Sequence, residues 1–156
     1  MSESKNEKPA GRARLAKCLD APGGITEEDA LFLAESALEL KSKSVNAELD
    51  RVVEEIAALT AQAAPAPTRE IRVKIYDLAN TVHSVAATFD RRALGLAAYH
   101  LCELLDAFDT QGRWDQEAVW VHSVSMLALR DDGRIPPEVR MEMIEGLRQV
   151  VVKATA

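Results

Sequence analysis

The sequence predicts an all-α protein, folded as an antiparallel bundle of about five helices. Proline and glycine cluster at a few sites, and the stretches between them are rich in Ala, Leu, Glu and Arg, which favour helix. Apolar residues within these stretches recur at alternating steps of three and four, as one face of a helix requires. The alternation of β-branched residues that is typical of strands is absent. Because the predicted connections are short, neighbouring helices are expected to run antiparallel.

The first predicted helix spans residues 26–64. Thr26 is a favourable N-cap, and three acidic residues follow it in the first turn. Apolar residues form a single stripe from Val45 to Ala63, while the polar segment 41–44 interrupts the pattern before it. We therefore expect a kink or a hydrated patch at that segment. Pro65 ends the helix because proline disfavours the helical conformation in the residue before it.

The second and third predicted helices span residues 69–89 and 91–109, the third with Asp90 as its N-cap. The second has the most regular apolar period in the chain, and this stripe is expected to lie in the core. Its members are Ile71, Ile75, Leu78, Val82, Val85 and Phe89.

A fourth helix is expected over residues 116–130, with Asp115 as its N-cap. Pro137 then suits the first position of a fifth helix, where its missing N–H leaves no bond unmade. Residues 1–14 are predicted to be a flexible polar tail, and residues 15–156 a single helical bundle domain.

Composition narrows the classes of function. The chain has 156 residues and a net charge of −6, and residues 1–17 carry five basic against two acidic side chains. An acidic body does not favour binding to nucleic acid, which depends on clustered Lys and Arg. The sequence contains no apolar run near the roughly 18 residues of a membrane span, and Cys18 and Cys102 stand far apart. We therefore expect a cytoplasmic protein that binds neither nucleic acid nor membrane.

Motifs for phosphate loops, hydrolases and zinc sites are absent, so no cofactor and no metal site are expected. The three histidines all fall inside predicted helices. His83 lies on the second helix away from the core stripe and is expected to point outward. His100 is expected at the periphery, and His122 is expected to be half-buried.

The segment Leu78–Phe89, LANTVHSVAATF, resembles the L-A-H-x-L-K-G-x-A-x-x-F segment of histidine phosphotransfer (Hpt) domains. Leu94 and Leu101–Leu105 resemble the next helix of that family. Ala118–Val124 resembles a stretch in an alphaproteobacterial subgroup, some members of which are tied to chemotaxis. The resemblance covers about residues 69–130 and implies a four-helix Hpt-like core and a role in two-component signalling.

Three defining positions of the family differ in this chain. The phosphorylated histidine falls on Asn80, the supporting lysine on His83 and the small glycine on Ser84. An amide cannot become a phosphoramidate, so the resemblance implies a pseudo-phosphotransferase rather than an enzyme. Such a protein would bind a response-regulator receiver domain or a histidine kinase as an adaptor or regulator. The implied receiver-binding face comprises Arg72, Tyr76, Asn80, His83, Ser84 and Ala87.

Four arginines are expected to gather near this face, where positive charge would suit an acidic receiver site. They are Arg69, Arg72, Arg91 and Arg92.

Two alternatives stay open. The chain could be an active phosphotransfer protein that uses His83 or, less favoured, His122. It could instead be a structural helical protein that forms a homodimer through helix 26–64, with the Val45–Ala63 stripe as the subunit contact.

Overall fold

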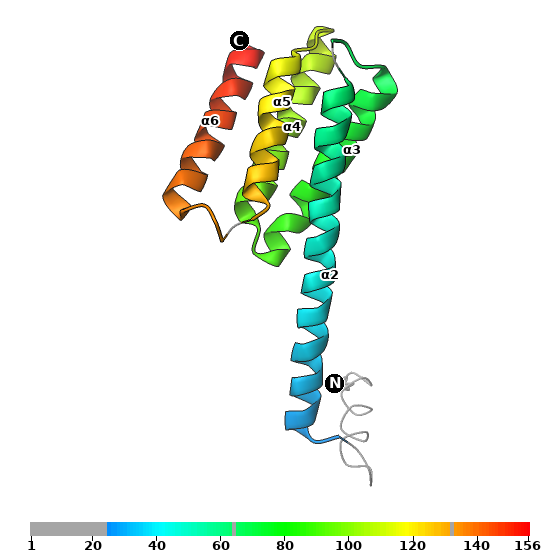
Figure 1. The fold of residues 1–156 in the computed structure, drawn as a ribbon, viewed down its shortest axis with the longest axis vertical. Coiled ribbons are helices and arrows are strands. Elements are labelled where there is room, and N and C mark those ends of the chain that lie inside the picture. The colour runs from blue at the N-terminus through cyan, green and yellow to red at the C-terminus, as the bar shows by residue number, and fades with distance from the viewer. Residues whose placement is uncertain (1–24, 64, 132) are drawn as a thin grey trace, which may run out of the picture. The chain divides into compact units, whose positions relative to one another are not determined.

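The computed structural model describes residues 25–63, 65–131 and 133–156 and confirms the all-α class. The described residues form five α-helices and one short 3-10 helix, and contain no strand (Figure 1). The elements are α2 (Glu27–Gln62), α3 (Arg69–Ala86), η1 (Ala87–Phe89), α4 (Arg92–Gln111), α5 (Gln116–Leu129) and α6 (Pro137–Thr155). The predicted tail, residues 1–14, lies outside the described residues.

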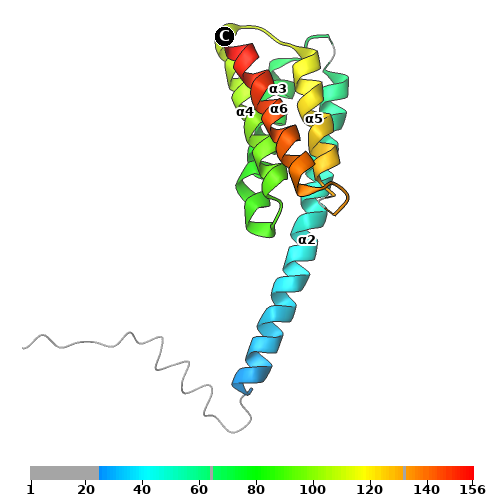
Figure 2. The same cartoon turned by 90° about the vertical axis from the view of Figure 1, so that its left-hand side faces the viewer.

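The chain divides into two compact units, residues 1–42 and 43–156. The second unit is an antiparallel bundle in which α4, α5 and α6 each run opposite to the helix before them (Figures 1 and 2). Helix α4 is central, because it packs against α3, α5 and α6, while α5 also packs against α6. Its apolar core residues include Leu94, Leu101, Leu104, Leu105 and Phe108.

The part of α2 in the second unit contributes to this core. Leu49, Val52 and Ile56 are at most 5% exposed, and the buried Thr60 hydroxyl lies 2.8 Å from the Ser123 hydroxyl on α5. The Val45–Ala63 stripe therefore contributes to the intramolecular core, which does not favour the alternative in which this stripe forms a subunit contact. An apolar stripe of this period shows which side chains share one face of the helix, but it does not show what packs against that face.

Residues 41–44 are helical, and α2 runs through this segment without interruption. Lys41, Lys43 and Ser44 are exposed, as the hydrated patch expected there requires.

Local chemistry sets several helix ends as predicted. Asp115 accepts a hydrogen bond from the Ala118 N–H at 3.0 Å and caps α5, and Pro137 occupies the first position of α6. The prediction for Asp90 was wrong: this residue has φ of 63°, and no side chain caps α4. The tight reversal after η1 requires a left-handed residue, which aspartate adopts more readily than most.

The buried stripe of α3 is shifted from its predicted position. Ile75, Ala79, Val82 and Ala86 are fully buried, whereas Leu78 and Val85 are half-buried. The physical reason is the close approach of α4. A Cβ built on Gly95 would lie 3.5 Å from the Ala86 Cβ, so small side chains occupy the line of closest packing and the larger ones flank it.

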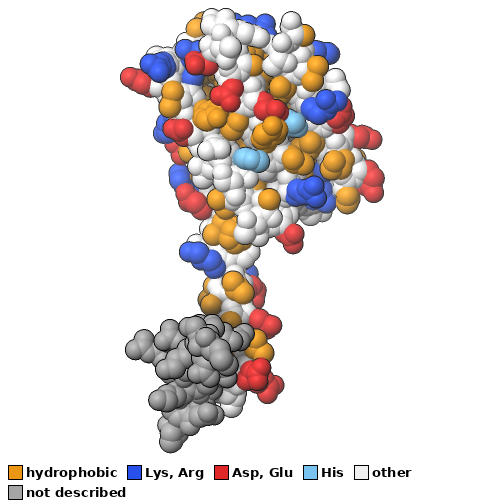
Figure 3. Space-filling model, turned by 180° about the vertical axis from the view of Figure 1, so that it is seen from behind, with side chains coloured by type: hydrophobic (Ala, Val, Ile, Leu, Met, Phe, Trp, Pro, Cys, Tyr) orange, Lys and Arg blue, Asp and Glu red, His pale blue; other side chains and the backbone are white. Residues whose placement is uncertain are grey.

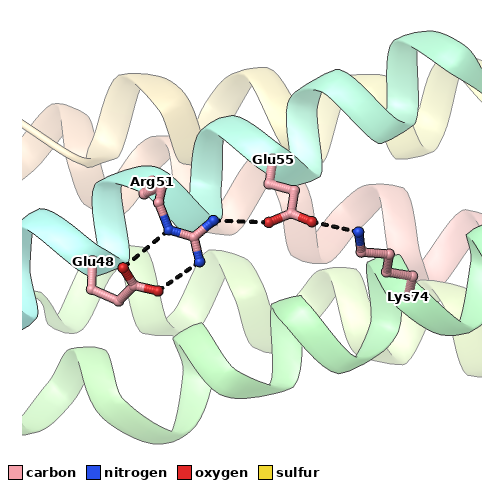
Figure 4. A network of polar contacts seen from close by, with 4 residues as sticks. All are labelled: Glu48, Arg51, Glu55 and Lys74. Carbon is pink, nitrogen blue, oxygen red and sulfur yellow. Dashed lines mark hydrogen bonds and ion pairs between the residues drawn. The ribbon is translucent and has the colours of Figure 1, made fainter.

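A chain of ion pairs links α2 to α3 on the surface of the second unit (Figure 4). Arg51 binds Glu48 through two nitrogens and reaches Glu55 at 3.2 Å, and Glu55 in turn binds Lys74 on α3 at 2.6 Å. Lys74 lowers the pKa of Glu55, and Arg51 lowers that of Glu48. Glu48, Arg51 and Lys74 are exposed and Glu55 is half-buried, so the network is expected to contribute little to the stability of the fold.

Candidate functional site

The predicted receiver-binding residues lie along α3, and the structure exposes most of them. Asn80, His83 and Ser84 are exposed, as is Ala87 at the start of η1. Arg72 and Tyr76, nearer the beginning of α3, are half-buried. The expectation that this face of α3 points away from the core is therefore confirmed for Asn80 and His83. We call the surface of α3, η1 and α4 around these two residues the Asn80 face.

His83 is the chemically best defined side chain on the Asn80 face. Its Nδ1 lies 3.2 Å from the backbone carbonyl oxygen of Gly95 on α4. A carbonyl oxygen only accepts hydrogen bonds, so Nδ1 is the nitrogen that donates. In the neutral ring the lone pair available to another group is consequently on Nε2. The ring also lies against Tyr99, with 5.2 Å between the two ring centroids.

Asn80 presents an amide without an acid–base partner. Its backbone carbonyl accepts a hydrogen bond from the Ser84 hydroxyl at 2.7 Å, and the Thr81 hydroxyl donates to the Asp77 carbonyl at 2.9 Å. Both hydroxyls are therefore turned back onto their own helix. The surface that they form is polar in composition but has few hydroxyl donors directed outward.

Helix α4 supplies one edge of the Asn80 face. Glu103 accepts hydrogen bonds from the Tyr99 hydroxyl at 3.0 Å and from His100 Nδ1 at 2.9 Å. The first of these bonds, with the carboxylate charge, raises the pKa of Tyr99. His100 is only 8% exposed, so its predicted peripheral position was wrong. It is buried because α4 is the central helix, covered on several sides.

A small hollow lies at the other end of the predicted surface. It has a volume of about 190 Å³, too small for most organic ligands. Asp109 lies 3.9 Å from the guanidinium of Arg72, and the Tyr76 hydroxyl donates a long hydrogen bond of 3.5 Å to Asp106. The Asp106 charge raises the pKa of Tyr76. The lining comprises Arg69, Arg72, Val73, Tyr76, Leu105, Asp106 and Asp109.

The four arginines do not form one cluster, contrary to the expectation from sequence. Arg69 and Arg72 lie at the start of α3, whereas Arg91 and Arg92 follow its end, about 27 Å away for a helix of this length. Arg91 also pairs with Asp50 of α2 at 2.5 Å. The sequence suggested one cluster because two of the arginines lie at each end of the same helix. It does not show that the length of that helix separates the two pairs.

His122 is fully buried rather than half-buried, and this corrects the prediction. Its Nδ1 donates to the Ala118 carbonyl at 2.8 Å, while Nε2 has no hydrogen-bond partner. Burial lowers the pKa of this imidazole. Because the His122 side chain is 0% exposed, a receiver domain could not contact it, and His122 is no longer a candidate phosphoacceptor.

Sequence reasoning missed the contribution of α4 to the Asn80 face. Tyr99 is 40% exposed beside His83, and Gly95 provides the carbonyl that fixes the His83 ring. Gly95 could have predicted this contribution, because a glycine inside a helical pattern often marks the close approach of another backbone or helix. Seen from behind, the molecule shows histidine, hydrophobic and acidic side chains side by side (Figure 3).

No family model matches the chain, and neither a curated protein nor a solved structure matches it. Among residues 25–63, 65–131 and 133–156, no group of three His, Cys, Asp or Glu side chains could hold a metal ion. Within the same ranges, every helix is too short or too polar for a membrane span.

Proposed function

We propose that the chain is a non-catalytic adaptor or regulator of the Hpt type, acting in the cytoplasm in bacterial two-component or chemotaxis signalling. It would bind a receiver domain or a histidine kinase through the Asn80 face. One observation carries the proposal: an exposed amide stands where the resemblance places the phosphorylated histidine. An amide can accept and donate hydrogen bonds at a docking surface but cannot accept a phosphoryl group.

The surface around Asn80 suits docking for a physical reason. Asn80, Ser84 and Ala87 are short, so ordering them in a complex costs little side-chain entropy. The Ser84 hydroxyl already bonds to its own helix, which reduces the desolvation cost of covering it. The rings of His83 and Tyr99, which contact each other at a tilt of 45°, add an amphipathic contact of the kind that is enriched in interfaces.

Charge gives this face little preference for an acidic partner. Glu103, Asp106 and Asp109 lie along α4, and Arg72 pairs with Asp109. We therefore expect binding to depend on shape and apolar contact, with a weak dependence on salt. A steep loss of affinity with salt would instead indicate a positively charged surface elsewhere on the chain.

The experiment measures binding of the purified chain to the receiver and kinase domains of its organism by isothermal titration calorimetry. Ala87→Glu places a charge on the exposed Asn80 face and should weaken binding about tenfold or more. Ala128→Glu, the same change at an exposed site on α5, is the matched control and should leave affinity unchanged. Equal effects of the two variants, or no binding to any of these domains, would refute the proposal.

A second candidate function, phosphotransfer through His83, is favoured by one specific contact. The Gly95 carbonyl holds the proton on Nδ1, so the neutral exposed ring offers Nε2 as a nucleophile. In that reaction the Nε2–P bond forms as the P–O bond to a receiver aspartate breaks, and the aspartate leaves as a carboxylate.

Phosphate content separates the two functions. After incubation with a phosphorylated receiver, the wild type and His83→Gln should both remain at background under the adaptor proposal. An acid-labile, base-stable phosphate that is present in the wild type and in Asn80→Ala, and absent from His83→Gln, would establish phosphotransfer instead.

A further inference from the structure

The first unit carries an exposed apolar surface that the proposed function does not use. Its described part consists of residues 25 and 26 and the beginning of α2, up to residue 42. The large apolar side chains here are more than half exposed, in contrast to the leucines and isoleucine of α2 in the second unit. They are Ile25 at 53%, Leu31 at 58%, Phe32 at 67%, Leu33 at 55%, Leu38 at 70% and Leu40 at 68%.

Four of these side chains form two rows that lie about 160° apart around the helix, one on each flank of a strip of alanines. At 100° per residue, Leu31 and Leu38 form one row and Leu33 and Leu40 form a second row. Ala34 lies between the rows, together with Ala30 and Ala37, so that two ridges of leucine flank a shallow strip. Phe32 projects about 160° from Ala34, on the opposite side. We call the two leucine rows and the alanines between them the leucine face.

The charges along the same segment have a polarity. Glu27 and Lys41 lie on the same side as Ala34, one near each end of the segment, whereas the other charged residues lie within about 60° of Phe32; these are Glu28, Asp29, Glu35, Glu39 and Lys43. An identical segment running antiparallel would therefore bring the acidic end of one copy to the basic end of the other. A parallel arrangement would instead place like charges side by side, which is destabilising.

We propose that the leucine face binds the leucine face of a second copy of this chain in an antiparallel, two-fold symmetric pair. With the centre of the pair between residues 35 and 36, each leucine row packs along the same row of the second copy. Leu31 then lies about two residues, or 3 Å along the axis, from alignment with Leu38 of the other copy, and Leu33 is equally far from alignment with Leu40. Ala34 meets Ala37 at the centre, where small side chains let the helices approach closely. Lys41 then lies within one turn of Glu27 of the second copy. A two-fold pair uses the same surface twice, as most homodimers do.

The size of the surface sets the strength of the pair. A helix of 16 residues is about 24 Å long, and two such helices bury less than the roughly 1,600 Å² of a standard stable interface. The dimer is therefore reversible and depends on protein concentration.

Sedimentation equilibrium of the full chain over a hundredfold concentration range tests the proposal. The wild type should shift from monomer to dimer, and Leu33→Glu should shift the dissociation constant upward about tenfold or more. Phe32→Glu is the matched control, because Phe32, at 67% exposure, is at least as accessible as Leu33 at 55% but lies on the opposite side of the helix. This variant should dimerise as the wild type does. A wild-type chain that stays monomeric, as it would if residues 1–24 covered the leucine face, overturns the proposal. So does equal weakening by both variants.

Cross-linking tests the direction of the helices. In a Cys18→Ser background, cysteine at Ala34 should form a disulfide between copies, because this position lies near the centre of the pair. Cysteine at Ala30 should not, because the two copies of residue 30 would be about 11 positions, or 17 Å, apart along the antiparallel axis. Efficient cross-linking at both positions would show a parallel pair and overturn the antiparallel arrangement.

Discussion

Three glycines allow one substitution, glycine to alanine, to test three different environments of the fold. Gly95 lies inside α4, against α3, and Gly146 lies inside α6, where an added Cβ would meet nothing within 4 Å. Gly112 ends α4 with φ of 63°. The change in side chain is identical in each case, so differences in the result report the backbone conformation and the packing.

The structure sets the expected magnitudes. Gly146→Ala should stabilise the fold by about 0.8–1 kcal/mol, the difference in helix propensity between the two residues. Gly95→Ala should give the same gain, because its Cβ would lie 3.5 Å from the Ala86 Cβ and 3.7 Å from the His83 carbonyl oxygen, both ordinary van der Waals separations. Gly112→Ala should instead destabilise by about 1 kcal/mol, because an L-residue with a side chain is strained in the left-handed region.

Urea unfolding followed by circular dichroism measures all three variants. A gain of about 1 kcal/mol also raises Tm by about 2–4 °C for a chain of this size. If Gly95→Ala lowers stability while Gly146→Ala raises it, then α3 and α4 are closer than the structure has them. If Gly112→Ala is neutral, the left-handed end of α4 is wrong.

The core, the buried histidine and the buried thiol each give a further prediction. Ile75→Ala should lower the free energy of unfolding by about 2–5 kcal/mol, because Ile75 is fully buried. Asn80 is exposed, so Asn80→Ala should change this free energy by at most about 0.5 kcal/mol. Equal losses of stability in urea unfolding would contradict the assignment of the α3 faces. Burial lowers the pKa of His122 below its ordinary value of 6.5, so the unfolded chain binds a proton at this imidazole more readily than the folded chain does. The free energy of unfolding should therefore fall as the pH drops below 6.5, by up to about 1.4 kcal/mol per pH unit. His122→Gln should flatten this part of the profile, and an unchanged slope would show that other groups cause it. Burial raises the pKa of the Cys102 thiol to about 11. Iodoacetamide at mildly alkaline pH should therefore label the Cys102 peptide in urea and not in the folded protein. Equal labelling rates in the two conditions, measured by mass spectrometry, would refute the burial of Cys102.

Helix ends could be predicted from the sequence where one local preference decides them. Asp115 caps α5 and Pro137 begins α6, because both residues favour those positions strongly and compete with nothing nearby. Asp90 shows the limit of this reasoning. Aspartate suits an N-cap and also tolerates the left-handed conformation, and only the geometry of the reversal between η1 and α4 decides between the two.

The exposed side of α3 could be predicted, but the partners of its residues could not. The period of the helix places Asn80 and His83 opposite the core. The hydrogen bond from His83 to Gly95 depends on how closely α3 and α4 pack, and the ion pair of Arg91 joins residues 41 positions apart. Such pairings are set by tertiary structure, so the sequence could place His83 on the surface but could not predict which of its nitrogens is available.

Helix α2 shows most directly what an apolar pattern can and cannot predict. Leu49 and Ile56 are at most 3% exposed, whereas Leu33 and Leu40, in the same helix, are more than half exposed. The local sequence around each pair is that of an amphipathic helix, because periodicity depends on which side chains share a face and not on what lies opposite. A helix is stabilised in water mainly by burial of its apolar face, and a segment of about 16 residues is marginal without it. The bundle supplies that burial for Leu49 and Ile56. For Leu33 and Leu40 the described residues supply none, and a second copy of the same segment is the partner that we propose for them.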